Sequence, residues 1–271
     1  MLIYGKEISQ QMRTEFTEWC GSQDIELVLL QAGDDPGSRS YITGIRNYLK
    51  DSSVTVNLVQ LDADVSMEKA LQAVEDLNRN PRVKGVMMLR PWPAGVDESA
   101  LMEALSPSKD VEGIHPINLG RLLKGQKSVL PATPKSAVNI LKHHNIPISG
   151  RPICVVGRSY NVGLPLALML IKENATVTIC HSKTKNLADI TRSAEIVVLA
   201  VGKAGFLTAD MINENAVVVD VGTNINEAGK LVGDAAPEAL EKAAIATAVP
   251  GGVGSLTVAT LMDNLRMLCS K

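Results

Sequence analysis

Short apolar segments alternate with segments of helical spacing along much of this 271-residue chain, and this alternation restricts the fold more than any other feature. The apolar segments have the length of strands, and residues 66–78 between two of them show the apolar spacing of one helix face. Strands that alternate with helices predict parallel sheets joined by crossover helices. The expected strands are residues 25–31, 54–61, 85–89, 153–156, 175–180, 196–201 and 216–221. The predicted class is therefore α/β with a mainly parallel sheet.

The length of the chain favours two domains. A break reading PISGR at 147–151 precedes a second, more regular run of strands. We place the boundary at the end of the first run, which gives an N-terminal α/β domain over 1–134 and a second domain over 135–253. Residues 254–271 contain one more helical segment, and its spacing alone does not say to which domain it returns.

Composition excludes several classes of function. A formal net charge of −2 and 3% aromatic residues argue against a nucleic-acid-binding surface. No apolar run reaches the roughly 18 residues of a membrane helix, and the first residues contain no signal core. The four cysteines are scattered, as is typical of reduced thiols in a cytoplasmic protein, and no Cys or His group has metal-ligand spacing. We expect no nucleic acid, no membrane and no metal.

A loop after one of the predicted strands carries the clearest chemical pattern. Residues 155–165 read VVGRSYNVGLP, between a strand and a helix. Gly157 suits the tight turn and Gly163 allows close approach of helix and strand, while the helix N-terminus offers N–H groups to a pyrophosphate. The spacing, which passes through Ser159, is not the usual GxGxxG, so a plain glycine turn in a domain without a ligand is the alternative.

The end of the next strand distinguishes between two cofactors. A domain that binds NAD usually has an acidic residue there for the ribose 2′-hydroxyl. This chain reads CHSKT at 180–184 and has no carboxylate in that stretch. Ser182 and Lys183, with Arg158 from the glycine loop, instead offer donors and positive charge to a 2′-phosphate, which favours NADP. The alternative is that Arg158 and Lys183 are ordinary solvated charges.

The chain resembles a known family in both halves. The motifs are GDDPGSRSY, PWPAGVD, KDVEGIHPINLGRL, PATPKSAV, GRSYNVG, CHSKT, VGKAGF, VVVDVGTN, LVGD and VPGGVGSLTVATL. Together they resemble the methylenetetrahydrofolate dehydrogenase/cyclohydrolase family over nearly the whole length. The resemblance implies a folate-binding domain and a Rossmann-like NADP domain with the reaction in a cleft between them. It also implies a homodimer and a C-terminal helix, 254–271, that packs on the first domain.

The resemblance also implies roles for individual residues. Tyr41 would line the folate cleft, and Glu112 stands where the family usually has an aspartate that hydrogen-bonds the pterin. The segment expected to close the cleft is Pro250, Gly251 and Gly252. The residues expected to bind NADP are Gly157, Arg158, Ser159, Gly163, Ser182, Gly222 and Thr223.

Two positions depart from the family pattern in the expected catalytic site. The family has a lysine four residues after the tyrosine, and this chain has Ile45 there, on the same helix face as Tyr41. The family usually reads VQLPLP where residues 88–93 read MLRPWP, so Leu89 replaces a glutamine. Hydride transfer is mainly a matter of positioning, whereas hydrolysis needs a proton carrier, which is typically worth ~10²–10⁴-fold. We therefore expect NADP-dependent oxidation of 5,10-methylenetetrahydrofolate with weak or absent cyclohydrolase activity.

Three alternatives stay open. The first is a bifunctional enzyme that also makes 10-formyltetrahydrofolate, with Arg90 or another group as proton relay, although arginine stays protonated and is a poor shuttle. The second is a non-catalytic protein that binds folate and nucleotide. The third is an unrelated NADP reductase with a small substrate.

Overall fold

The structure is a computed structural model that describes residues 1–270, and it divides into two compact units. We call the first the six-stranded unit; it comprises Met1–Gln10 and Pro131–Thr260. We call the second the three-stranded unit; it comprises Gln11–Leu130 and the chain from Leu261 onward. Helices α1 (Lys6–Cys20) and α10 (Thr257–Cys269) each contribute residues to both units.

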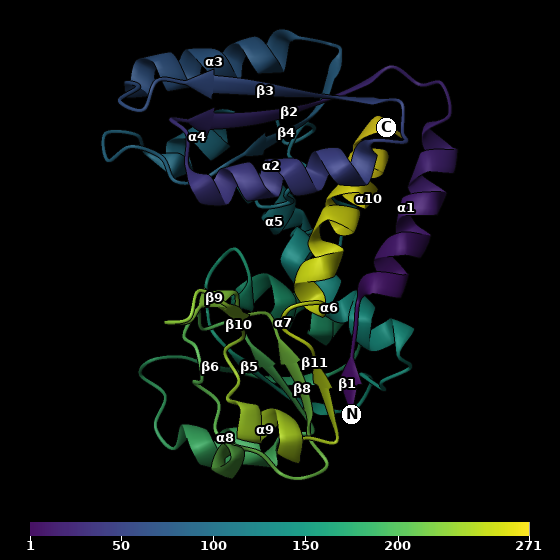
Figure 1. Ribbon diagram of the computed structural model, residues 1–271, viewed down its shortest axis with the longest axis vertical. Helices are drawn as coiled ribbons and strands as arrows, with labels where there is room; N and C mark the ends of the chain where they lie inside the picture. Colours follow the sequence, from purple (N-terminus) through teal and green to yellow (C-terminus); the bar gives the residue numbers. More distant parts are fainter. Residues whose placement is uncertain (271) are drawn as a thin grey trace. The chain divides into compact units, whose positions relative to one another are not determined.

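The three-stranded unit is built on a parallel sheet with the order β3-β2-β4. Its strands are β2 (Ile25–Ala32), β3 (Val54–Leu61) and β4 (Val83–Met88), and its other helices are α2 (Pro36–Leu49), α3 (Met67–Arg79), α4 (Glu98–Ala104) and α5 (Pro116–Leu123). Figure 1 shows α3 and α2 on opposite sides of the strands. Val28 and Leu30 pack in the core on the α3 side, so their neighbours Leu29 and Gln31 face α2.

The six-stranded unit has a fully parallel sheet with the order β1-β11-β8-β7-β5-β6. Its strands are β1 (Leu2–Ile3), β5 (Pro152–Val156), β6 (Thr176–Cys180), β7 (Ile196–Leu199), β8 (Val217–Asp220) and β11 (Ile245–Thr247), with a short antiparallel pair β9 (Asn224–Ile225) and β10 (Leu231–Val232). Its helices are α6 (Ala132–His143), α7 (Gly163–Lys172), α8 (Leu187–Ser193) and α9 (Pro237–Lys242), with 3-10 turns η1 (Ala209–Met211) and η2 (Val253–Leu256).

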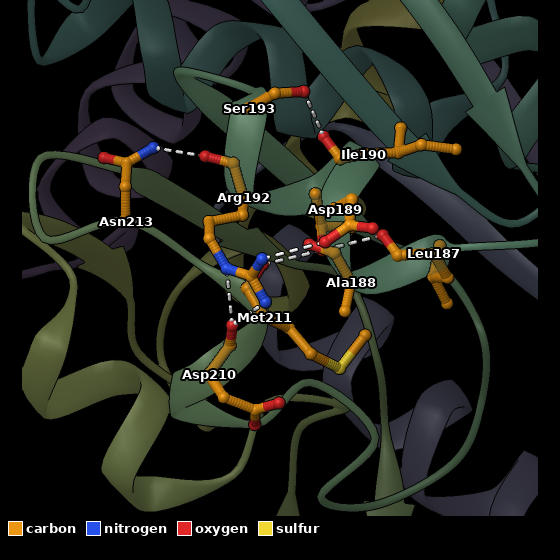
Figure 2. Close-up of polar contacts among 10 residues, drawn as sticks. Leu187, Ala188, Asp189, Ile190, Arg192, Ser193, Asp210, Met211 and Asn213 are labelled. Atoms are coloured by element: carbon orange, nitrogen blue, oxygen red, sulfur yellow. Dashed lines mark hydrogen bonds and ion pairs between the residues drawn. The ribbon is translucent and has the colours of Figure 1, made fainter.

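One face of this sheet is covered by α8, η1 and α9, which pack on a core of small and β-branched residues. Polar contacts fix η1 against α8. Arg192 donates from Nε and Nη2 to the carbonyl of Asp210 at 2.9 and 2.8 Å (Figure 2). The Thr191 hydroxyl donates to the carbonyl of Met211 at 2.6 Å. These bonds satisfy the carbonyl groups of the irregular segment between β7 and β8.

The predicted α/β class is confirmed, and the seven expected strands are all present with ends shifted by a few residues. The expected domain limits need correction. Met1–Gln10 belongs to the six-stranded unit because β1 pairs with β11, with Leu2 beside Ala246, and the division falls after Leu130 rather than after residue 134. The last helix is divided as well, since its first turn up to Thr260 lies with the six-stranded unit. No helix within residues 1–270 is long and apolar enough to cross a membrane.

Candidate functional site

An open pocket of about 260 Å³ lies in the three-stranded unit where β4 ends. Its lining residues are Asp35, Gly37, Ser38, Tyr41, Met87, Met88, Leu89, Arg90 and Glu112. The start of α2 forms one wall because Asp35 caps this helix, accepting the backbone N–H of Ser38 at 2.8 Å, with Pro36 in the first helical position. The Ser38 hydroxyl donates to the carbonyl of Arg90 at 2.7 Å and so ties the helix to the end of β4.

Glu112 is a buried acid in the wall of the pocket. Its side chain is 15% exposed, and its Oε2 atom is buried without a hydrogen-bond partner. Burial raises the pKa of Glu112 to about 7, although the nearby Arg90 guanidinium opposes this effect. Nη1 of Arg90 lies 3.7 Å from Oε1 of Glu112, and Nε of Arg90 donates to Glu98 at 2.8 Å. A buried polar atom without a partner is costly, and the residue that carries this one lines an open pocket, so a ligand that brings N–H groups to Oε2 would satisfy it.

A second buried acid shapes the turn that carries Glu112. The Asp110 carboxylate accepts the backbone N–H groups of Gly113 and His115 at 2.9 and 2.8 Å and the Asn118 amide at 2.9 Å. These donors offset the desolvation that raises the pKa of Asp110. The backbone N–H of Val86 in β4 also bonds to the carbonyl of Lys109 at 2.7 Å. The turn is therefore held both by its own acid and by the sheet.

The two residues that depart from the family pattern, Leu89 and Ile45, lie in different surroundings. Leu89 lines the pocket and is 4% exposed, whereas Ile45 is fully buried and does not line it. Tyr41, one turn before Ile45 on α2, lines the pocket. Leu89 therefore contributes apolar surface to the pocket where the family has an amide, whereas Ile45, where the family has an amine, lies outside the pocket lining.

Two residues near the pocket were not singled out as binding residues by their sequence. Arg90 could be recognised only as a poor proton relay, because its position beside Glu112 depends on the fold. Gln31 in β2 is 3% exposed, donates to the Gly33 carbonyl at 3.1 Å and leaves Oε1 without a partner. In the sequence, the only indication that Gln31 is unusual is that it is a polar residue within an apolar strand.

The glycine loop of the six-stranded unit has the predicted context, since it leaves β5 and enters α7. Gly157 has a φ of +133°, and a side chain there would meet the carbonyl of Ala200. A side chain at Gly163 would collide with the carbonyl of Gly157, so both positions require glycine. The Ser159 hydroxyl accepts the N–H groups of Val162 and Gly163 at 3.2 and 3.4 Å. Arg158 is exposed at the start of the loop.

A compact turn follows β6 and presents the residues expected to bind a 2′-phosphate. The N–H of His181 donates to the Thr184 hydroxyl at 2.8 Å, and the N–H of Lys183 donates to Nδ1 of His181 at 3.1 Å. Ser182 and Lys183 are exposed at its tip. The turn thus offers a hydroxyl group and positive charge at the carboxyl edge of the sheet.

Two buried aspartates organise the loops that carry Gly222 and Thr223. Asp220 accepts the N–H groups of Gly222, Asp234 and Ala235 at 2.9, 3.0 and 2.8 Å. Asp234 accepts three consecutive N–H groups, at 201–203, and the Asn224 amide at 2.9 Å. Gly222 has no room for a side chain because Asp234 lies against it, whereas Thr223 is exposed. The sequence did not reveal these aspartates as organising residues.

The segment Pro250–Gly252 also lies in the six-stranded unit. The Gly5 N–H donates to the carbonyl of Gly251 at 2.9 Å, and the Ser255 hydroxyl donates to the same carbonyl at 3.0 Å. Gly251 has a φ of +105°, and a side chain there would come close to the Tyr4 ring. Within residues 1–270, no cluster of His, Cys, Asp or Glu could hold a metal ion.

These features define an α/β protein with a Rossmann-like dinucleotide domain and a second α/β domain with its own pocket. Residues 131–271 match the tetrahydrofolate dehydrogenase/cyclohydrolase NAD(P)-binding domain, and residues 3–112 match the catalytic domain of the same family. The chain belongs to the tetrahydrofolate dehydrogenase/cyclohydrolase family, as its motifs predicted. It is 44% identical to "Bifunctional protein FolD 2" of Syntrophomonas wolfei over the full length of both chains. It is 42% identical to "Bifunctional protein FolD" of Bacillus subtilis, over 97% of this chain and 95% of the relative.

Solved structures agree with this assignment. The bifunctional FolD of Campylobacter jejuni matches with a TM-score of 0.95 and 34% identity, over 100% of this chain and 98% of the other. The Trypanosoma brucei FolD, solved with NADP cofactor and an inhibitor, matches with a TM-score of 0.92 and 30% identity, over 100% and 97%. A silkworm 5,10-methylenetetrahydrofolate dehydrogenase matches with a TM-score of 0.93 and 32% identity, over 99% and 97%.

Proposed function

We propose that the protein oxidises 5,10-methylenetetrahydrofolate to the methenyl form with NADP. The observation that carries this proposal is the glycine loop at the end of β5, paired with a turn after β6 that offers a hydroxyl and positive charge in place of an acid. Names of relatives that match the chain over nearly its full length support the same reaction. The three-stranded unit would hold the folate, and the six-stranded unit would hold the cofactor.

The residues of the loop fit a dinucleotide. Gly157 and Gly163 leave space where side chains would collide with backbone, and the N-terminus of α7 provides N–H groups suited to a pyrophosphate. Arg158, Ser159, Ser182 and Lys183 would hold the 2′-phosphate end. A bound NADP would supply the hydride acceptor, and the folate's own nitrogens would stabilise the cation that remains. The protein therefore has to position the reactants rather than carry a proton.

Glu112 would anchor the folate in the pocket beside Tyr41. Its unpartnered Oε2 and neighbouring Oε1 can together accept two N–H groups, which is the pattern that a pterin offers through N3–H and its 2-amino group. Gly222, Thr223 and Pro250–Gly252 would act at the nicotinamide end. These roles, and the homodimer that the resemblance implies, are proposals that ligand titration and light scattering can test.

Hydrolysis of the methenyl product is the second candidate activity, and two kinds of evidence point in opposite directions. The relatives named bifunctional, at 44% and 42% identity, support it. Ile45 and Leu89 support a weak or absent hydrolase, because neither can move or orient a proton. Both lines of support agree on the dehydrogenase activity. They differ only on the hydrolase activity, which an assay can decide.

The test follows reduced cofactor with 5,10-methylenetetrahydrofolate and NADP or NAD, and separately the decay of added methenyltetrahydrofolate. We expect cofactor reduction with NADP, together with methenyl decay close to the rate in buffer. Enzyme-dependent methenyl decay would establish the bifunctional alternative. Binding of both ligands without cofactor reduction would instead identify a non-catalytic binding protein, and failure to bind any folate would refute the proposal.

A further inference from the structure

Two oppositely charged side chains lie next to each other on the wall of the pocket. Glu112 has one carboxylate oxygen without a partner, and Arg90 places Nη1 3.7 Å from the other oxygen. Both residues line the pocket, and the Arg90 side chain is 40% exposed, so its guanidinium reaches the open space. The usual family sequence has leucine where this chain has Arg90, so this chain has a cation on the pocket wall at a position that is apolar in the family pattern.

We propose that Arg90 is a specificity-determining residue that donates a hydrogen bond to the 4-oxo oxygen of the pterin ring. The inference rests on the proposed function, because it takes a folate as the occupant of the pocket. Along one edge, a 2-amino-4-oxopteridine presents the 2-amino donor, the N3–H donor and the O4 acceptor in sequence. A carboxylate beside a guanidinium presents two acceptors followed by donors, which is the complementary order.

The surrounding contacts hold Arg90 in the orientation that this role requires. Nε donates to Glu98 at 2.8 Å, and the Arg90 carbonyl accepts the Ser38 hydroxyl at 2.7 Å. One edge of the guanidinium is thus fixed by Glu98 while Nη1 lies next to Glu112. A planar guanidinium fixed along one edge directs its other N–H groups in defined directions, as a flexible lysine would not.

Arg90 also affects the charge of Glu112, the residue that would accept the N3–H and 2-amino groups. The charged groups around Glu112 are Arg90, which lowers the pKa of this carboxyl, and Asp110 and Glu98, which raise it. Arg90 therefore helps Glu112 to stay ionised and able to accept two N–H groups near neutral pH. Replacement of Arg90 would weaken both the direct contact to O4 and the acceptor beside it.

The test compares folic acid, which carries the 4-oxo group, with its 2,4-diamino counterpart of the same tail. Calorimetric titration in the presence of NADP gives both dissociation constants for the natural chain, for Arg90→Leu and for Arg39→Leu. Arg39 is a matched control because it is an exposed cation of α2 that pairs with Asp34. We expect Arg90→Leu to reduce the preference for the 4-oxo ligand by roughly tenfold or more, the effect of one charge-assisted hydrogen bond. Arg39→Leu leaves the preference unchanged.

Other results would overturn the inference. Equal weakening of both ligands by Arg90→Leu would show that Arg90 only supports the pocket, and an unchanged preference would show that it does not contact the ring. An unchanged melting temperature and NADP affinity would establish that the variant is folded. Cofactor reduction without a 4-oxo preference in the natural chain would refute this inference alone, whereas absence of folate binding would refute the proposed function as well.

Discussion

Asp220 in the six-stranded unit and Glu112 in the three-stranded unit are both buried acids, and they are satisfied in different ways. Asp220 accepts three backbone N–H groups from neighbouring loops. Glu112 has a buried oxygen without a partner and an arginine at 3.7 Å. A carboxylate whose acceptors are filled by the chain holds loops together, whereas one whose acceptors face a pocket is available to a ligand. On this difference we propose that Asp220 is a structural acid and Glu112 a binding acid.

The largest expected effect comes from restoring the two polar residues that the family pattern has where this chain has Ile45 and Leu89. Ile45→Lys with Leu89→Gln should increase enzyme-dependent methenyltetrahydrofolate hydrolysis by roughly 10²–10⁴-fold, because a positioned proton carrier contributes that much. Methenyl decay at fixed enzyme concentration measures the gain. Leu89→Gln alone is the control and should give little increase. A folded double variant without any gain would show that these two positions do not limit hydrolysis.

Removal of the structural acid should mainly affect stability. Asp220→Ala leaves three buried N–H groups unpaired, and each such group costs about 1–3 kcal/mol. We expect the free energy of unfolding in urea to fall by about 3 kcal/mol or more. Asp220→Asn, which keeps one acceptor oxygen, should lose less. A loss below about 1 kcal/mol would contradict the assignment of Asp220 as a loop-holding acid.

Removal of the binding acid should have the opposite effect on stability. The pKa of Glu112 rises from 4.5 to about 7 on folding, so the folded state binds the extra proton and loses stability as pH rises through this interval. Glu112→Gln should therefore raise the free energy of unfolding at pH 8 by on the order of 2–3 kcal/mol, since one pKa unit is about 1.4 kcal/mol. Near pH 4.5 the gain should vanish, and urea unfolding at both pH values checks this. A gain of the same size at both would exclude titration as its cause.

The smallest effect is a pH dependence of substrate binding. As pH falls below about 7, Glu112 takes up a proton and loses one of its acceptors, so KM for 5,10-methylenetetrahydrofolate should rise by up to tenfold per pH unit. Initial rates from pH 6 to 8.5 measure it, with KM for NADP as the internal control. Arg90→Leu should move the midpoint upward because it removes the cation that lowers this pKa. A flat KM profile would show that substrate binding does not depend on the protonation state of Glu112.

The sequence correctly predicts those features of the fold whose determinants lie close together in the chain. The apolar strands and the Gly157–Gly163 loop lie within short stretches, so their spacing alone indicates a strand, a turn and a helix. The sequence does not predict strand β1, because its two residues show no periodicity and pair with β11 far along the chain. The sequence also does not indicate that the pKa of Glu112 is raised, because this depends on burial by segments that only the fold brings together.

The position of β1 at the sheet edge has a consequence for synthesis on the ribosome. Leu2 and Ile3 are made long before their partners Ala246 and Thr247, because the rest of both units lies between them in the sequence. Domains generally fold as units from the N-terminus during synthesis, yet this strand has to wait for its neighbour. The six-stranded sheet therefore acquires its edge strand β1 only after β11 has been made, although β1 precedes every other strand of the sheet in the sequence.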